Sequence, residues 1–104
     1  MNKILVYITF SSEEEAIEMV QELLKKDLIA CGNILPQSKS LYKYKGVIEQ
    51  TSETLVLCKT TENAYFALES FVCANHSYDL PCVMTLPISG GSVEFLNWIA
   101  NPES

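Results

Sequence analysis

The pattern of apolar positions changes period along the chain, and each change marks an element of secondary structure. Residues 3–10 are apolar on both faces of an extended chain, which predicts a central strand covered on at least part of both sides. In residues 10–28 apolar side chains recur at helical spacing and predict one buried stripe. The stripe consists of Ala16, Val20, Leu23 and Leu24. Ser11 with Glu14, or Ser12 with Glu15, would form a capping box at the helix start.

A second helix is predicted over residues 61–75, again from apolar positions on one face. Thr60 or Thr61 can cap its start. Its predicted inner face consists of Ala64, Leu68, Phe71 and Val72. Pro81 ends any helical continuation, because proline restricts the residue before it to an extended shape.

The segment between the two helices predicts a long hairpin. Lys45-Gly46 is a turn signal between two strand-like runs. Each arm spans roughly fifteen residues, whereas a typical strand has about five or six. One small domain cannot cover arms of that length, and an uncovered sheet edge is a hazard that natural proteins cover or pair. The hairpin therefore predicts pairing with a neighbouring subunit.

The last part of the chain predicts a strand over residues 82–88 and a short helix over residues 93–100, capped by Ser92. The order of elements is then β-α-β-β-α-β with a C-terminal helix. That order is typical of an α+β ferredoxin-like sandwich, an antiparallel sheet with two helices on one face. At 104 residues the chain should form a single domain, residues 1–104.

Composition narrows the function classes. The net charge of −6 argues against a nucleic-acid partner, since phosphate binding depends on clustered Lys and Arg. A cationic ligand or a metal ion suits the charge better. No signal peptide is expected, because acidic residues begin at Glu13 without a small-residue cleavage site. The apolar run of residues 4–8 is too short to span a membrane. A cytoplasmic protein whose four cysteines are free thiols is the expectation, although a disulfide stays open.

The segment "CANHSYDLPC", residues 73–82, holds the residues best suited to chemistry. Cys73, His76, Asp79 and Cys82 recur at every third position, and thiolate and imidazole are ligands that suit Cu(I) and Zn²⁺. Pro81 prevents a single helical face, however, so the spacing alone favours semi-buried cysteines and a histidine at a helix end. A catalytic thiol would need a base and an orienting group, and no oxyanion-hole motif or nucleophile elbow accompanies these residues.

Several segments together resemble the CutA divalent-cation-tolerance family. "LLKKDLIACGNILP" is similar to its helix-to-strand segment, and "SLYKYKGVIEQTSETLVLCKTT" to its long hairpin. "HSYDLPC" is similar to its His-Pro-Tyr-Glu-x-Pro-Glu loop, and "FLNWI" to its terminal Tyr-Leu-x-Trp-Leu. The resemblance implies a ferredoxin-like fold similar to the PII signalling proteins and a homotrimer in which the hairpins pair between subunits. It implies tolerance of copper and other divalent cations. Because the catalytic motifs named above are missing, we expect no enzymatic activity.

Departures from the family pattern fall where the resemblance would place metal ligands. Ile8 and Asn75 stand where some relatives have Cys and His, and Cys82 replaces a carboxylate. Two hypotheses follow. In the first, the trimer binds Cu or Zn ions through His76 and Cys82, with Asp79 as a further ligand. In the second, a PII-like regulatory or scaffolding trimer binds a small anion or an unidentified protein partner at inter-subunit clefts. The residues assigned to the cleft are Lys59 and Tyr78, and those assigned to the trimer interface are Tyr42, Tyr44 and Trp98.

Overall fold

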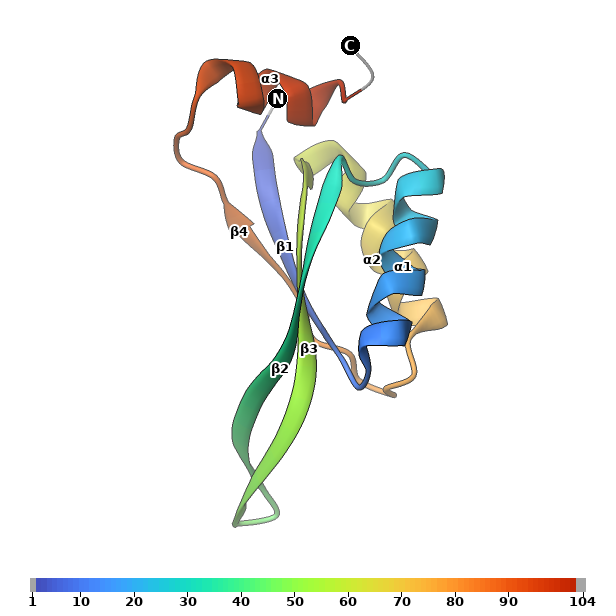
Figure 1. Cartoon of the computed structure of the whole chain (residues 1–104), viewed down its shortest axis with the longest axis vertical. Helices are drawn as coiled ribbons and strands as arrows, with labels where there is room; N and C mark the ends of the chain where they lie inside the picture. The colour runs from blue at the N-terminus through green and yellow to red at the C-terminus, as the bar shows by residue number, and fades with distance from the viewer. Residues whose placement is uncertain (1, 103–104) are drawn as a thin grey trace.

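The computed structural model describes residues 2–102 and has the predicted element order (Figure 1). The strands are β1 (Lys3–Phe10), β2 (Cys31–Tyr44), β3 (Val47–Thr61) and β4 (Val83–Pro87). The helices are α1 (Glu13–Lys25), α2 (Tyr65–Asn75) and α3 (Val93–Ala100), with a 3₁₀ turn, η1, at Glu62–Ala64. The strands form one sheet in the order β2-β3-β1-β4, and every neighbouring pair is antiparallel. This α+β arrangement confirms the predicted ferredoxin-like fold.

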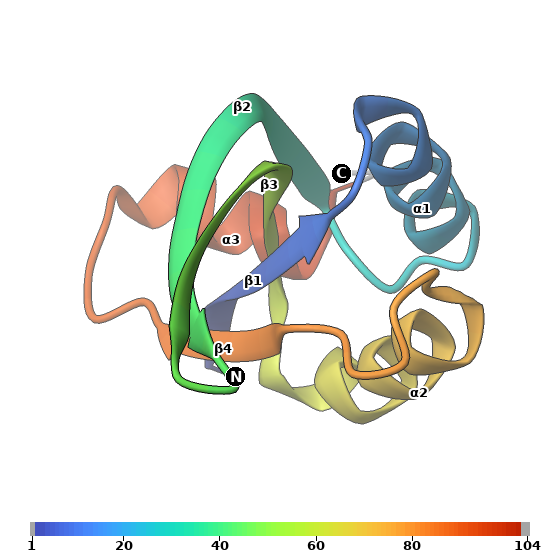
Figure 2. The same ribbon diagram turned by 90° about the horizontal axis from the view of Figure 1, so that it is seen from below.

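The hydrophobic core lies between one face of the sheet and the helices α1 and α2, which both pack on that face (Figures 1 and 2). Alternate residues of β1 and β3 point into it, including Val6, Phe10 and Val56, each with none of its surface exposed. Leu23 of α1 and Leu68 of α2 meet them and are equally buried. The period of two in the strands and of 3.6 in the helices therefore generates the core, as the sequence predicts.

The stripe on α1 differs from the prediction at two positions. Ala16, Val20 and Leu23 are buried as predicted, but Leu24 is 40% exposed and Met19 takes its place in the core. Met19 lies four residues before Leu23 and so falls on the same face of the helix, whereas Leu24 lies four residues after Val20, at the opposite edge of that face. Hydrophobicity alone does not distinguish the two, because both side chains are large and apolar.

The start of α2 also differs from the prediction. Thr60 lies in β3, buried, and its hydroxyl donates to the carbonyl of Leu28 at 2.7 Å. Thr61 precedes the 3₁₀ turn and makes no capping bond through its side chain. Of the predicted inner face, Leu68 and Val72 are buried, whereas Ala64 and Phe71 are only half-buried.

The long hairpin confirms the predicted length of its arms. β2 has 14 residues and β3 has 15, and Lys45 and Gly46 form the turn with positive φ angles. The residues of the outer half, 41–50, are all exposed, and the hairpin extends well beyond the helices (Figure 1). The radius of gyration is 14.5 Å, against about 13 Å for a compact domain of this length. The excess is the consequence of the projecting hairpin.

Truncation of Leu68 tests the position of the core. We expect Leu68→Ala to lower the free energy of unfolding by about 2–5 kcal/mol, because it leaves a cavity under a fully buried side chain. Phe66→Ala on the same helix removes a larger side chain that is 79% exposed and should change the free energy by about 0.5 kcal/mol or less. Denaturant unfolding measures both, and equal effects would contradict the assignment of the inner face of α2.

Candidate functional site

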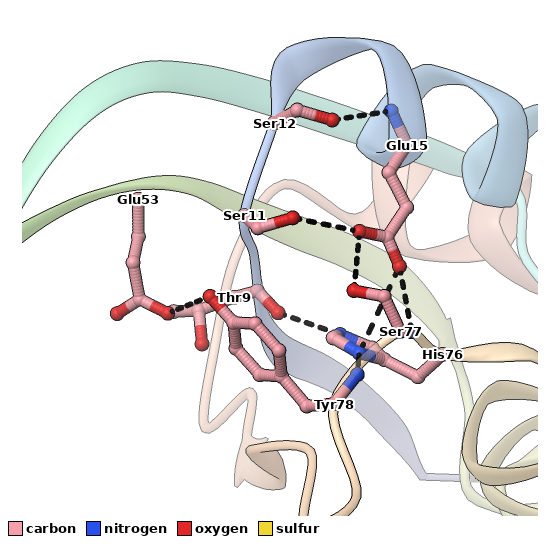
Figure 3. A network of polar contacts seen from close by, with 8 residues as sticks. All are labelled: Thr9, Ser11, Ser12, Glu15, Glu53, His76, Ser77 and Tyr78. Carbon is pink, nitrogen blue, oxygen red and sulfur yellow. Dashed lines mark hydrogen bonds and ion pairs between the residues drawn. The ribbon is translucent and has the colours of Figure 1, made fainter.

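His76 lies at the centre of a polar network where the end of α2, the end of β1 and the start of α1 meet (Figure 3). Its side chain is fully buried. The imidazole stacks on Phe10, with ring centroids 4.6 Å apart, and contacts Tyr78 at 4.8 Å. The buried ring has apolar neighbours on its faces and polar neighbours at both nitrogens.

Both ring nitrogens of His76 have hydrogen-bond partners. Nε2 lies 2.8 Å from the carbonyl oxygen of Thr9, and Nδ1 accepts the backbone N–H of Tyr78 at 3.0 Å. A carbonyl oxygen only accepts, so Nε2 carries the hydrogen and His76 is the neutral Nε2–H tautomer. A metal ligand needs a free nitrogen lone pair, and here the only lone pair in the ring plane is used by Tyr78.

Glu15 anchors the same loop from the first turn of α1. Its carboxylate accepts the backbone N–H of Ser77 at 2.9 Å, the hydroxyl of Ser77 at 2.8 Å and the hydroxyl of Ser11 at 3.2 Å (Figure 3). It lies 3.8 Å from Nδ1 of His76. The helix N-cap is Ser12, whose hydroxyl accepts the N–H of Glu15 at 3.1 Å. Of the two predicted N-cap residues, Ser12 is confirmed. The carboxylate of Glu15, however, accepts hydrogen bonds from Ser77 in the loop and does not complete the capping box.

These contacts fix the charge of Glu15. Burial acts to raise the pKa of its carboxyl, but the N–H and hydroxyl of Ser77 and the hydroxyl of Ser11 together lower this pKa below the ordinary value of 4.5. The ionised form is therefore the form that holds the loop, since only the carboxylate accepts all three donors.

Glu53 of β3 forms a second carboxylate centre, on the inner part of the hairpin. It accepts the hydroxyl of Ser40 on β2 at 2.6 Å and the phenol of Tyr78 at 2.8 Å. Burial and the hydrogen bond to Glu53 raise the pKa of Tyr78 to about 12. Burial and the charge of Glu53 also raise the pKa of the Cys82 thiol. Tyr78 thus joins the loop of residues 76–82 to the hairpin (Figure 3), and the thiol of Cys82 is held in its less reactive, protonated form.

The predicted metal ligands do not converge within one chain. Among residues 2–102, no three His, Cys, Asp or Glu side chains are placed to hold a metal ion. His76 is buried, Cys82 is half-buried and Asp79 is exposed. Cys73 is exposed on α2, and all four cysteines are unpaired. The donor set of the described residues of one chain therefore does not fit a resident metal ion.

The predicted cleft residues also lie apart within one chain. Tyr78 contacts Glu53, and Lys59 follows Glu53 by six residues along β3, a separation of about 20 Å at 3.3 Å per residue. The predicted interface residues lie on two surfaces, with Tyr42 and Tyr44 exposed on the hairpin and Trp98 half-buried on α3 against Phe95.

The roles of Glu15 and Glu53 are missing from the sequence-based assignment. From the sequence, Glu15 is expected only as the partner of Ser12 in a capping box, and Glu53 has no assigned role. Each acquires its role from a loop more than twenty residues away along the chain, so only a tertiary contact distinguishes it.

The strand order β2-β3-β1-β4 and the two helices on one face of the sheet define a protein of the ferredoxin-like class. The sequence pattern of the CutA1 divalent ion tolerance protein family matches residues 4–102. The chain belongs to this family. It is 42% identical over 94 residues to the divalent-cation tolerance protein CutA of Archaeoglobus fulgidus, covering 90% of this chain and 91% of that protein.

Solved structures agree with the family. Rice CutA1 superimposes with a TM-score of 0.91 at 36% identity, covering 95% of this chain and 91% of that chain. The divalent cation tolerance protein of Thermus thermophilus gives a TM-score of 0.90 at 38% identity, covering 94% and 95%. The chain spans only about half the length of its plant and mammalian relatives, for example 54% of the chloroplastic CutA of Arabidopsis thaliana. Among residues 2–102, no helix is long and apolar enough to cross a membrane.

Replacement of Glu15 tests the charged anchor. In Glu15→Gln we expect the free energy of unfolding at pH 7 to fall by about 1 kcal/mol, because hydrogen bonds to a charged acceptor are stronger than neutral ones. The folded-state pKa of Glu15 lies below 4.5, so its ionisation stabilises the fold above about pH 4.5 and this contribution is lost as the pH falls through the folded-state pKa. The difference between the two proteins should therefore shrink at acid pH.

The control for this experiment is Glu18→Gln, an exposed position on the same helix that should change little at either pH. Denaturant unfolding between pH 3 and 7 measures all three proteins. A constant difference between wild type and Glu15→Gln over that range would contradict the role of the ionised carboxylate.

Proposed function

We propose that this protein acts in divalent cation tolerance, the role that the names of its relatives give to those proteins, and that it acts as a homotrimer without catalytic activity. The observation that carries the proposal is the face of the sheet turned away from α1 and α2, called here the second face. It is rich in apolar side chains, yet no helix of the described residues covers most of it.

Strand register defines the second face. Leu5 pairs with Leu86 and Tyr7 with Met84 across β1 and β4, and Leu55 pairs with Leu35 across β3 and β2. Met84 is 51% exposed, while Leu35 and Leu86 are each 43% exposed. The strands are therefore apolar on both faces, a pattern typical of a sheet that is covered on both sides. Contiguous exposed apolar surface of this kind marks an interaction site.

The projecting hairpin supports the same conclusion. Its outer half carries exposed Leu41, Tyr42, Tyr44, Val47 and Ile48. A two-stranded ribbon is marginally stable alone in water, and β2 and β4 leave both edges of the sheet open. Further copies of the chain would cover both the hairpin and the second face. This surface supports the proposal that the chain has partners, and the resemblance to the CutA family supports the number three.

Metal binding belongs to the proposal only as a property of the assembled protein. Because residues 2–102 of one chain do not gather three ligands, a Cu or Zn site would take donors from more than one subunit. Cys82 is the soft donor that suits these ions, and exposed Asp79 is the nearest carboxylate in sequence. Ligation by His76 stays a prediction, and ligation through Nδ1 would require loss of the hydrogen bond that Nδ1 accepts from the backbone N–H of Tyr78.

The absence of catalysis, the cytoplasmic location and the PII-like alternative are also proposals. The absence of catalysis is supported by the contacts of His76, whose nitrogens contact backbone groups and no thiol. A cytoplasmic location is our expectation for this chain, whereas the Arabidopsis relative is named chloroplastic and the solved Archaeoglobus protein is named periplasmic. The PII-like alternative depends on anion binding at Lys59.

Substitution on β4 tests the second face as an interface. Met84→Glu places a charge on the second face, whereas Thr85→Glu places the same charge on the opposite face of the same strand. At micromolar concentration we expect the wild type and Thr85→Glu to sediment as trimers and Met84→Glu to dissociate, because an unpaired charge in an apolar interface is strongly unfavourable. A trimer that survives Met84→Glu unchanged would exclude the second face as the interface.

Titration with Zn²⁺ and Cu(I) tests the metal role. We expect Cys82→Ser to weaken binding by at least about tenfold, the lower limit seen when even an outer-shell partner of a ligand is lost. Cys73→Ser, at the exposed cysteine on α2, should bind as the wild type does. Equal affinities in the wild type and Cys82→Ser would remove Cys82 from the site, and no binding by the wild-type trimer would refute the metal proposal.

A further inference from the structure

A small cavity lies at the end of the sheet opposite to the hairpin, where α3 ends (Figure 1). Its volume is about 240 Å³, slightly below the lower limit of about 300 Å³ for ligand pockets. Three segments form its wall: the connection from α1 to β2, the end of β3 with η1, and the end of α3. Most of the lining side chains are small and apolar: Ile29, Ala30, Ala64, Ile99, Ala100 and Pro102. Such a cavity accommodates a group of a few carbon atoms.

The cavity lies apart from the surfaces that we propose to contact other copies of the chain. Its lining includes no residue that the strand register places on the second face, none of residues 41–50 of the hairpin, and not Trp98. Thr60, which lines the cavity, is buried on the side of the helices and alternates along β3 with Lys59, which lies opposite Leu5 on the second face. Assembly through the second face and the hairpin therefore does not cover the lining residues.

Asp27 is the only charged residue among the described residues that line the cavity. It directly follows the C-cap of α1 and has a φ angle of 57°. Its N–H donates to the carbonyl of Leu24 at 3.0 Å, and the N–H of Leu28 donates to the carbonyl of Leu23 at 2.9 Å, which is the Schellman pattern of a helix end. Glycine is the usual residue at this position, because a Cβ disfavours the left-handed conformation. An aspartate here costs stability that a glycine would not.

The charge of Asp27 is also unfavourable at this position. The C-terminal ends of α1 and α3 both reach the cavity, and each carries the partial negative charge of a helix dipole. The two preceding lysines contact other groups: Lys25 pairs with Glu22 at 3.2 Å. Nζ of Lys26 lies 5.0 Å from the ring centroid of Phe71. Within residues 2–102 the carboxylate of Asp27 forms no ion pair, so the cavity presents negative charge without a cation.

A residue that breaks the local rules of stability is often retained for function. We propose that the cavity binds a small primary alkylammonium, with the ammonium on the carboxylate of Asp27 and the alkyl chain against Ala30, Ala64 and Ile99. Thr61 makes no capping bond through its side chain, so its hydroxyl is a second acceptor for an ammonium, which has three N–H donors. The ligand class goes beyond the proposed role in divalent cation tolerance, because the site recognises N–H donors and an alkyl chain and needs no metal ion.

Butylammonium is the probe, and butan-1-ol is its uncharged counterpart with the same number of non-hydrogen atoms. Methyl NMR titration of the assembled wild-type protein at pH 7, in EDTA, should show saturable binding of butylammonium in the millimolar range expected for so small a ligand. The binding should be about tenfold tighter than that of butan-1-ol, since a charge-assisted hydrogen bond is about twice as strong as a neutral one. The shifts should appear at Ala30, Ala64 and Ile99.

Substitutions of Asp27 separate its charge from its conformation. Asp27→Asn keeps the shape of the side chain and its tolerance of positive φ, and it should lose the preference for butylammonium. Asp27→Gly should lose this preference too, and in the absence of ligand it should raise the melting temperature by about 2–4 °C, because it removes both the strain and the charge. Glu14→Gln, at an exposed position at the other end of α1, should bind both probes as the wild type does.

The proposal is overturned if butylammonium does not bind saturably, if the two probes bind equally, if the NMR shifts lie elsewhere, or if Asp27→Asn binds as the wild type does. A lower melting temperature of Asp27→Gly would also contradict it, because aspartate would then be the residue that the fold itself prefers. The comparison of the two probes on the wild type decides the matter even if a variant does not fold. EDTA makes the result independent of metal binding, so failure here would leave the proposed function untouched.

Discussion

The second face of the sheet is the constraint on which the rest of the structure depends. Four strands carry apolar side chains on both faces, and the two long helices cover only one of them. Burial of apolar surface supplies most of the free energy of folding, so the exposed apolar side chains of this second face favour the proposed assembly with further copies of the chain. The exposed hairpin, the open strands at both edges and the separated candidate ligands all become intelligible if further copies complete the molecule.

The polar network around His76 holds the loop of residues 76–82 in a fixed position on the single chain. Buried polar groups must be hydrogen-bonded, and within residues 2–102 no buried side-chain nitrogen or oxygen lacks a partner. Glu15 holds Ser77, His76 joins Thr9 to Tyr78, and Tyr78 reaches Glu53 on the hairpin. The loop of residues 76–82 is thus tied to α1, β1 and β3 together. In the single chain His76 is a structural residue, because both of its ring nitrogens form hydrogen bonds that hold the loop in place.

Local patterns in the sequence were sufficient for most of the fold. Periodicity predicted β1, α1 and the hairpin because each forms from neighbouring residues, and Gly46 suits the positive φ angle at the second position of the turn. The burial of Met19 instead of Leu24 could not be predicted, because it depends on which face of α1 packs against the sheet. The polar network around His76 could not be predicted from local patterns, because residues such as Glu15 and Ser77 lie 62 positions apart in the sequence. Spacing in residues 73–82 suggested a cluster, while Pro81 and the buried contacts of His76 separate its members.

Hydrogen exchange of the backbone amides in the outer half of the hairpin tests the central claim most directly. These amides are bonded only between two exposed strands in a single subunit. If further copies cover the hairpin, amides of residues 41–50 that pair β2 with β3 should be protected to nearly the same extent as those of β1 at micromolar protein concentration. Exchange at close to the rate of an unstructured peptide in residues 41–50, with β1 still protected, would show a free hairpin and contradict the account.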